Sequence, residues 1–303
     1  MQQRSGSEPM ALYGFRSDWE TAPRSTPSAT MLLAIGDVHG FAGHLDAMLA
    51  LLQPEIAVAH VRGVASQLVL IGDYIDRGPA SLPVLRRIPR LGGELGIPVH
   101  ALRGNHDQYL IEFLTAERPS YDLLEFWCGN GGDTTLAELG IDEGTMLTSE
   151  PATLAAKARG IAGPEIMALL GGLEPHWQVG DYVFVHAGVH PDKSLNEHEL
   201  EELLWLRQPF LGAHDWPHPF VVVHGHTIRG PEVRPHRIAI DSGCYRTGVL
   251  TAVQLLDDRL RFWCVTSDPA LEAFHRLPGL GQKRRFGQPE KLREPDSGTA
   301  RPA

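Results

Sequence analysis

The sequence predicts an α/β fold in which two mixed β-sheets pack face to face, with helices on their outer sides. Two observations lead to this prediction. Short apolar runs, typical of buried strands, alternate with segments of helical periodicity along most of the chain. Near the C-terminal end, two longer apolar segments flank Asp257-Asp258, as the strands of an antiparallel hairpin would. Alternating strands and helices of this kind build layered α/β domains.

The overall composition limits the class of protein. A chain of 303 residues with 43% hydrophobic and 21% charged residues is typical of a soluble globular protein. The formal net charge of −10 argues against a nucleic-acid partner, and no apolar segment approaches the length of roughly 18 residues that predicts a membrane span. No secretory signal is recognisable, and the three cysteines form no CxxC pair. We therefore expect a cytoplasmic protein without a disulfide scaffold.

The first strand predicted lies at Met31–Ile35 and runs into the sequence GDVHG at 36–40. The preceding residues 1–30 are polar and contain no continuous apolar segment, so we expect a flexible N-terminal extension. After the strand, apolar residues at i, i+3, i+4 and i+7 spacing predict a helix over His44–Leu52. Strand, polar loop and helix together make half of a βαβ unit.

Two further strands follow the same plan. Leu68–Ile71 is a run of four apolar residues that ends in GDYIDRG at 72–78, and a helix disturbed by two prolines is expected around Ser81–Leu91. Pro98–Leu102 predicts the third strand, which ends in GNHD at 104–107 and leads into another helix. In open α/β sheets, ligands bind beyond the carboxyl ends of strands, which is where these polar residues would lie.

Residues 117–178 differ in character from the segments around them. Short helical patterns at 134–139, 152–159 and 164–170 follow a turn at Asn130-Gly131-Gly132-Asp133. We expect a mostly helical insertion that caps the sheet edge, because insertions of this kind commonly shape a substrate pocket.

The remaining strands complete the sheets. Tyr182–Val185 ends in HAG at 186–188, and Ser194 with Glu197 forms a capping box ahead of a helix that continues to Leu206. Phe220–Val223 ends in HGHT at 224–227. A strand over 238–240, a hairpin of 248–256 with 259–265, and a polar flexible tail at 278–303 follow, which leaves 31–277 as the folded domain.

Potential metal ligands follow five predicted strand ends. They are Asp37 and His39, Asp73, Asn105 with His106, His186, and His226. Oxygen and imidazole donors without thiolate suit Mn, Fe, Zn or Co. A carboxylate can bridge two metals, and Asp73 is the candidate bridge. A pair of divalent ions at such a site activates a bridging water for in-line attack on phosphorus.

The five motifs in this order resemble the calcineurin-like metallophosphoesterases, and the Asp-Arg-Gly ending of the second motif resembles the phosphoprotein phosphatase branch in its bacterial and phage-type form. The resemblance covers about 37–243. It implies a four-layer α/β/β/α sandwich with two divalent metal ions, Mn first among the choices, where the strand ends meet.

Carried over by position, the resemblance implies a role for each residue. Asp37 and His39 would hold the first metal, Asp73 would bridge, and the second metal would be held by Asn105, His186 and His226. His106 would protonate the leaving alkoxide and Asp76 would hydrogen-bond His106. Arg77 and Arg207 would bind phosphate.

The substrate is predicted less sharply than the chemistry. Ile228 occupies the place where many nuclease and phosphodiesterase members carry a further histidine, which favours the phosphatase branch. A serine/threonine phosphoprotein phosphatase is therefore the first expectation, with a phosphorylated protein or small phosphoester as substrate. A symmetrical dinucleoside polyphosphate hydrolase and a non-catalytic binding module on the same fold are the alternatives, and the oligomeric state is left open.

Histidines outside the motifs have simpler interpretations. His224 is expected to have a structural role, and Asp241 is equally well read as a turn-former or as a partner of a metal-bound histidine. Six histidines in polar loops are expected to be exposed: His176, His190, His198, His214, His218 and His236.

Overall fold

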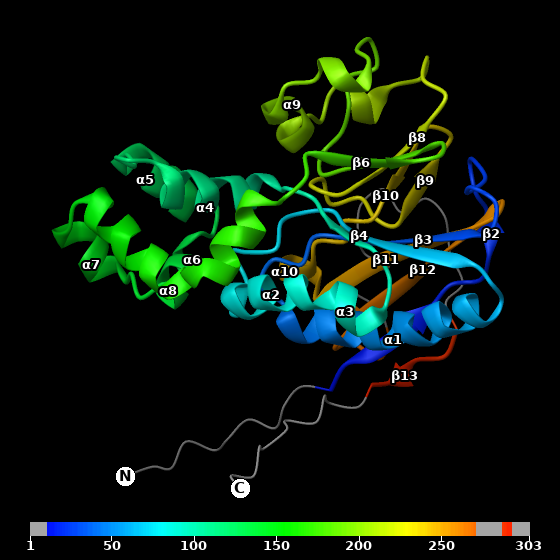
Figure 1. Cartoon of the computed structure of the whole chain (residues 1–303), viewed down its shortest axis with the longest axis horizontal. Coiled ribbons are helices and arrows are strands. Elements are labelled where there is room, and N and C mark those ends of the chain that lie inside the picture. Colours follow the sequence, from blue (N-terminus) through cyan, green and yellow to red (C-terminus); the bar gives the residue numbers. More distant parts are fainter. Residues whose placement is uncertain (1–10, 271–286, 293–303) are drawn as a thin grey trace, which may run out of the picture.

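The computed structural model describes residues 11–270 and 287–292, and within these ranges the chain forms two β-sheets with helices on their outer faces (Figure 1). The larger sheet contains β1 (Tyr13–Arg16), β2 (Glu20–Thr21), β3 (Thr30–Ile35), β4 (Ala65–Leu70), β5 (Val99–Ala101), β11 (Val249–Leu256), β12 (Arg259–Thr266) and β13 (Glu290–Lys291). The smaller sheet contains β6 (His176–Val179), β7 (Tyr182–Val185), β8 (Val221–His224), β9 (Glu232–Arg234) and β10 (Arg237–Ala239).

Helices surround the sheets and extend beyond one end of them (Figure 1). The α-helices are α1 (Ala42–Val61), α2 (Ser81–Arg87), α3 (Leu91–Leu95), α4 (Asn105–Thr115), α5 (Tyr121–Gly129), α6 (Asp133–Glu138), α7 (Glu143–Thr148), α8 (Pro151–Gly171), α9 (Leu200–Trp205) and α10 (Cys244–Thr247). Short 3₁₀ helices are η1 (Ile88–Arg90), η2 (Leu195–Glu197) and η3 (Phe210–Gly212). None of the helices in the described ranges is long and apolar enough to cross a membrane.

Both sheets are mixed, as the sequence predicts. The strand order in the larger sheet is β13-β1-β12-β11-β3-β4-β5, in which β3, β4 and β5 run parallel while β11 pairs antiparallel with both β3 and β12. The smaller sheet has the order β6-β7-β8-β10-β9, and its central pairs β7–β8 and β8–β10 are parallel. The carboxyl ends of β3, β4, β7 and β8 carry four of the five motifs, and the fifth opens α4.

The layers follow from side chains that alternate along the strands. In β3, Leu32 and Ala34 pack in the core between the two sheets, against residues such as Phe184 of β7. Leu33 and Ile35 point the other way, into the core formed with α1 and its neighbours. A third cluster joins the outer face of the smaller sheet to α9 and η3. Helix, sheet, sheet and helix therefore form the predicted four-layer α/β/β/α sandwich.

The two ends of the chain differ from the expectation of flexible extensions. Tyr13–Arg16 pairs antiparallel with β12, and Glu20–Thr21 pairs with the same strand. Glu290–Lys291 in turn pairs with β1. These segments are only two or four residues long and so show no apolar run. β1 lies between β12 and β13 and buries Phe15, whereas β13 lies at the edge of the sheet. The rest of the predicted extensions, 1–10, 278–286 and 293–303, lies outside the described residues.

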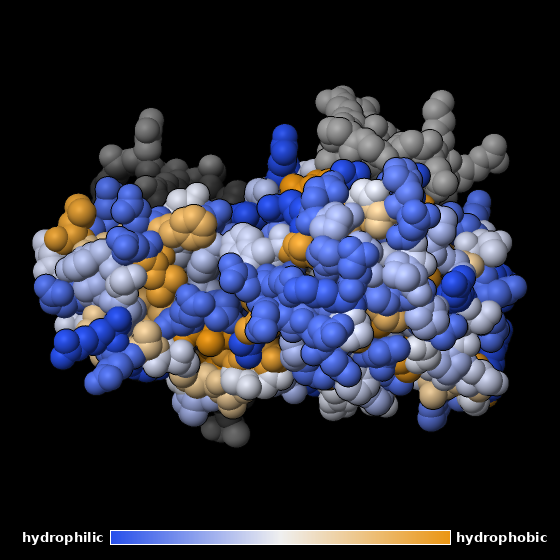
Figure 2. All heavy atoms as spheres, turned by 90° about the horizontal axis from the view of Figure 1, so that it is seen from above, coloured by the Kyte–Doolittle hydropathy of each residue, from blue (hydrophilic) through white to orange (hydrophobic). Residues whose placement is uncertain are grey.

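The segment 117–178 is mostly helical, as predicted, and contains α5 to α8 before β6 begins at His176. It packs against α2 and α4 beyond the strand ends (Figure 1). The two predicted helices at 152–159 and 164–170 lie within α8, which is interrupted at Gly163, where φ is +72°. Seen from the side of α9, most of the surface is hydrophilic, with small apolar patches toward the end where α4 to α8 lie (Figure 2).

Candidate metal centre

The predicted site residues converge where the strand ends meet. Asp37 and His39 follow β3, and Asp73 follows β4. Asn105 opens α4, while His186 follows β7. His226 follows β8 and completes the set. Because parallel strands place their carboxyl ends at the same edge, segments far apart in sequence become neighbours in space.

Four side chains form one cluster of donor atoms. Asn105 Oδ1 lies 2.9 Å from His186 Nε2 and 2.8 Å from His226 Nδ1. His186 Nε2 is also 3.3 Å from Asp73 Oδ1. The ligand atoms of Asp73, His186 and His226 all lie within 4.8 Å of one another and are buried. This is the group that the sequence assigns to the second metal.

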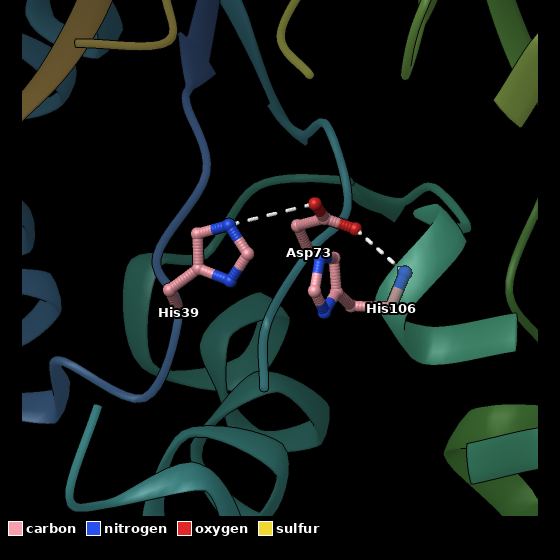
Figure 3. Close-up of side chains that lie close together, drawn as sticks. All are labelled: His39, Asp73 and His106. Atoms are coloured by element: carbon pink, nitrogen blue, oxygen red, sulfur yellow. Dashed lines mark hydrogen bonds and ion pairs between the residues drawn. The ribbon is translucent and has the colours of Figure 1, made fainter. Parts of the chain in front are cut away.

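Asp73 connects this cluster to another. Its Oδ2 lies 3.5 Å from His39 Nε2, and its Oδ1 accepts a hydrogen bond from the backbone N–H of His106 at 3.0 Å (Figure 3). His39 Nδ1 is 2.9 Å from the carbonyl oxygen of Ile75, which leaves Nε2 directed at Asp73. The two oxygens of one carboxylate thus face two groups of histidines, the position required of a bridging ligand.

Asp37 contributes a buried oxygen without a partner. Its Oδ2 accepts a hydrogen bond from the backbone N–H of His226 at 3.0 Å, whereas Oδ1 has no hydrogen-bond partner in the described structure. Burial raises the pKa of Asp37 well above its ordinary value, and the nearby charges of Asp241 and Asp73 raise it further. Carboxylates gathered this closely require a compensating positive charge.

The donor set fits two divalent cations. It consists of carboxylate and amide oxygens and imidazole nitrogens, with no thiolate, as Mn, Fe, Zn and Co prefer. Burial lowers the pKa of His39 to about 3 despite the opposing charge of Asp73, so this ring is neutral and has an electron pair to donate. The orphaned Asp37 Oδ1 is a further ligand atom that the described protein groups do not satisfy.

His106 and Asp76 form a buried pair beside this cluster. His106 Nδ1 lies 2.6 Å from Asp76 Oδ2, and both side chains are almost fully buried. Burial lowers the pKa of His106, but the charges of Asp73 and Asp76 outweigh it and hold the pKa above its usual 6.5. The ring also lies within 4.8 Å of ligand atoms of His39 and Asp73, so geometry alone allows either a proton donor or a ligand.

The backbone around the site is unusual in conformation. Positive φ values occur at His39, Asp73, Asp76, Arg77 and His226, between 46° and 73°. Residues with a Cβ rarely adopt this left-handed region, and such strain concentrates at functional sites. The left-handed conformation turns each loop sharply after its strand, so that side chains close together in sequence point toward the same cluster of donor atoms.

The two predicted phosphate-binding arginines are placed differently. Arg77 Nη1 lies 2.8 Å from His39 Nε2, and its guanidinium carbon lies 4.2 Å from the ring centre of Tyr245. Arg207 follows α9 and is exposed. Its charge is close enough to contribute to the lowered pKa of His186 and His226, in which burial is the largest cause.

The family model for calcineurin-like phosphoesterases matches residues 30–249, a range that contains every one of these groups. The chain belongs to the calcineurin-like phosphoesterase family. Its relatives include an asymmetrical bis(5'-nucleosyl)-tetraphosphatase PrpE of Halalkalibacterium halodurans, 25% identical over 81% of this chain and 98% of the relative. A symmetrical bis(5'-nucleosyl)-tetraphosphatase of Chromohalobacter salexigens is 26% identical over 74% of this chain and 94% of the relative.

Solved structures are similar to this chain at lower sequence identity. A cold-active protein tyrosine phosphatase of a Shewanella species is 19% identical, with 79% of this chain and 80% of that chain covered and a TM-score of 0.46.

Several residues of this calcineurin-like phosphoesterase support the site without being predicted from its motifs. Trp127 Nε1 donates to Asp76 Oδ2 at 2.7 Å, and Thr135 Oγ1 donates to Asp76 Oδ1 at 2.6 Å. Both come from the helical insertion, which therefore orients the carboxylate that contacts His106. Asp107 Oδ2 accepts hydrogen bonds from the backbone N–H groups of Asp73 and Gly104. Of these three supporting residues, only Asp107 lies within one of the sequence motifs, GNHD at 104–107.

The turn predicted at Asn130-Gly131 also holds a site residue. The Arg77 N–H donates to the Gly131 carbonyl at 2.9 Å, and Arg77 Nε donates to the Asn130 carbonyl at 3.3 Å. The turn interpretation thus stands, but the turn additionally positions the arginine.

Asp241 is buried, and its Oδ1 accepts a hydrogen bond from the Gly243 N–H at 2.7 Å, as a turn-former would. His236, expected to be exposed, is instead buried.

Gly225 leaves room for the carboxylate of Asp37 because it has no side chain. A Cβ at this position would lie 2.0 Å from Asp37 Oδ1, so Gly225→Ala must displace the carboxylate. We expect metal content, measured by atomic emission, to fall below two per chain, and turnover to fall about 10–100-fold. The control is Gly160→Ala, since a Cβ there meets nothing within 4 Å. Two bound metals and wild-type turnover in Gly225→Ala would show that Asp37 is not a ligand.

Proposed function

We propose that this chain is a dimetal phosphoester hydrolase in which His106 donates the proton to the leaving group. The observation that carries the proposal is the position of the Asp76-paired His106 ring, which has a nitrogen within 4.8 Å of Asp73, the carboxylate that lies between the two donor clusters. A proton donor must lie beside the phosphorus atom that reacts. Two metals that share a bridging carboxylate would bind the phosphate group close to that carboxylate, and therefore close to His106.

Two ions would be held by the residues already described. Asp37, His39 and Asp73 would bind one, and Asp73, Asn105, His186 and His226 the other. Divalent ions at such a site supply a nucleophile at neutral pH and neutralise charge on phosphoryl oxygens. Mn is the first choice, with Fe, Zn or Co as alternatives, because the donors are oxygen and imidazole nitrogen.

The chain's own groups would orient the substrate and move the proton. With Nδ1 bonded to Asp76, the His106 ring has Nε2 left to donate to the oxygen that leaves phosphorus. Arg77 presents a planar guanidinium suited to two phosphate oxygens, and its contact with Tyr245 keeps that plane in place. Arg207 would contribute a further positive charge from the exposed side.

For the substrate, we infer a dinucleoside polyphosphate. The tetraphosphatase relatives are similar over nearly their whole length. Partly exposed aromatic rings also flank both donor clusters. Tyr245 has its ring centre 5.1 Å from that of His39, and Trp205 lies 5.6 Å from His226. A base stacked on an aromatic ring contributes about 1–3 kcal/mol, so two rings suit a ligand with a base at each end.

The second candidate is the phosphoserine or phosphothreonine protein that the sequence favours first. The Asp76-Arg77-Gly78 ending of the second motif and Ile228 after the last motif support it. Such a substrate needs a protonated leaving group more than a nucleotide does, because an alkoxide is the stronger base.

Hydrolysis of two substrates side by side distinguishes these candidates. The Mn-loaded protein is given diadenosine tetraphosphate and a phosphoserine/phosphothreonine peptide, and the nucleotide products are identified by chromatography. We expect the higher kcat/KM with the dinucleotide. Tyr245→Ala should raise KM for the dinucleotide about tenfold or more and for the peptide by less, because the peptide loses only the support that Tyr245 gives to Arg77. Faster peptide turnover would select the protein phosphatase, and hydrolysis of neither substrate by protein with both metals bound would favour the binding module.

A further inference from the structure

Another concave site lies beside β9, β10 and η3. It has a volume of about 590 Å³, within the range of small-molecule pockets. Its lining includes four arginines: Arg24, Arg229, Arg234 and Arg237. None of the ten predicted site residues lines it. We call it the arginine pocket.

The charge of the arginine pocket is opposite to that of the chain as a whole. No carboxylate is among its lining residues in the described structure. Glu232 is not a lining residue, but its Oε1 lies 2.8 Å from Arg234 Nη2 and its Oε2 lies 2.6 Å from Arg237 Nη1. One carboxylate offsets one of four guanidinium charges and leaves three, in a protein whose formal net charge is −10. Cations held together in this way attract an anion.

Two buried side chains that line the pocket have ring or guanidinium nitrogen atoms without a hydrogen-bond partner. Arg237 is 2% exposed, and its Nη1 is paired with Glu232 Oε2 at 2.6 Å, whereas its Nε has no hydrogen-bond acceptor in the described structure. His236 is 7% exposed and its Nε2 is also without a partner. Unsatisfied buried polar atoms are uncommon in folded proteins and costly to maintain. An anion with several oxygen atoms would satisfy them.

Aromatic packing holds the wall of the pocket in place. The ring of Trp216 stacks on His236 with ring centres 5.1 Å apart and 29° between planes. Its Nε1 donates to the carbonyl of Phe220 at 2.8 Å. His218 in turn stacks on Phe220 at 4.8 Å. The aromatic wall and the buried Arg237 are therefore fixed in place, while Arg24 and Arg234 reach the pocket from exposed positions.

We propose that the arginine pocket binds a small anion carrying two or more phosphate groups. A phosphate group carries about 1.5 to 2 negative charges at neutral pH, so two groups match the three uncompensated guanidinium charges better than one does. Guanidinium forks pair with phosphate oxygens through two parallel hydrogen bonds. This binding uses none of the metal ligands and is independent of the hydrolytic function.

Calorimetric titration with imidodiphosphate tests the proposal, because its P–N–P link resists hydrolysis. The Mn-loaded full chain is expected to show two binding events, one at the metal centre and one at the arginine pocket. In the double variant Arg229→Gln/Arg234→Gln, one event should weaken at least tenfold and the other should persist. Arg77→Gln should weaken the other event. Thermal unfolding of each variant establishes that it is folded.

A matched control separates a built site from general attraction. Arg62→Gln/Arg86→Gln removes the same charge from exposed positions near α1 and α2 and should leave both events intact. An equal loss in this control would overturn the proposal, as would a single event abolished by Arg77→Gln alone. If the double variant fails to fold, Arg234→Gln alone, at an exposed position, is expected to weaken the same event.

Discussion

Replacing His106 with asparagine is expected to lower kcat about 10²–10⁴-fold while both metals stay bound. Asparagine can still face Asp76 but cannot deliver a proton to the leaving oxygen. The loss should depend on the leaving group. An aryl phosphate, whose phenolate leaves as a stabilised anion, should lose less than a phosphoserine peptide, whose alkoxide requires protonation. Steady-state kinetics on both substrates, with metal content measured on the same samples, provides the readout.

The exposed His60 at the end of α1 supplies the control for this experiment. His60→Asn makes the same chemical change outside the site and should leave kcat unaltered. The metal measurement is decisive because His106 lies within 4.8 Å of ligand atoms of His39 and Asp73. If His106→Asn loses a metal, the residue is a ligand and the proton-donor role is wrong. An equal loss on aryl and alkyl substrates would also contradict it.

Replacing Asp76 with asparagine should move the alkaline limit of activity to lower pH. His106 must be protonated to act as an acid, so activity falls as pH rises through its pKa. Burial lowers this pKa, while the charges of Asp73 and Asp76 raise it above 6.5 overall. When metals neutralise Asp73, Asp76 is the remaining carboxylate in contact with the ring. Its removal lowers the pKa, and each unit lost reduces the protonated fraction about tenfold at higher pH.

The measurement is kcat against pH from 5.5 to 9.5 for both proteins. We expect the alkaline limb of Asp76→Asn to shift by about one unit or more, with kcat at pH 8 lowered at least tenfold. Asp133→Asn, an exposed carboxylate at the start of α6, is the control and should keep the wild-type profile. A reduced kcat with an unshifted limb would mean that Asp76 only supports the structure, through its side-chain hydrogen bonds with His106, Trp127 and Thr135.

Sequence reasoning was effective where periodicity and loop chemistry agree. Tyr182–Val185 coincides with β7. The Ser194–Glu197 capping box is present, but it opens only the short η2, and the helix predicted to continue to Leu206 starts separately at Leu200. The predicted helix at His44–Leu52 is real but extends over Ala42–Val61, because Pro54 lies inside it without ending it. The strands β1 and β13 could not be predicted, since they form by backbone pairing with β12 and β1 and are too short to show an apolar pattern.

The sequence by itself indicated the family, which the family model confirms, and the strands that carry an apolar run. It also proposed the donor residues, because strand ends followed by Gly-Asp, Asn-His and His-Gly pairs are local signals. Only the tertiary structure decided which groups touch. It placed Asp73 between two histidine clusters and brought Trp127 and Thr135 onto Asp76 from more than fifty residues away. It also collected Arg24, Arg229, Arg234 and Arg237 around one pocket. Such contacts depend on how distant segments pack, and no local pattern encodes them.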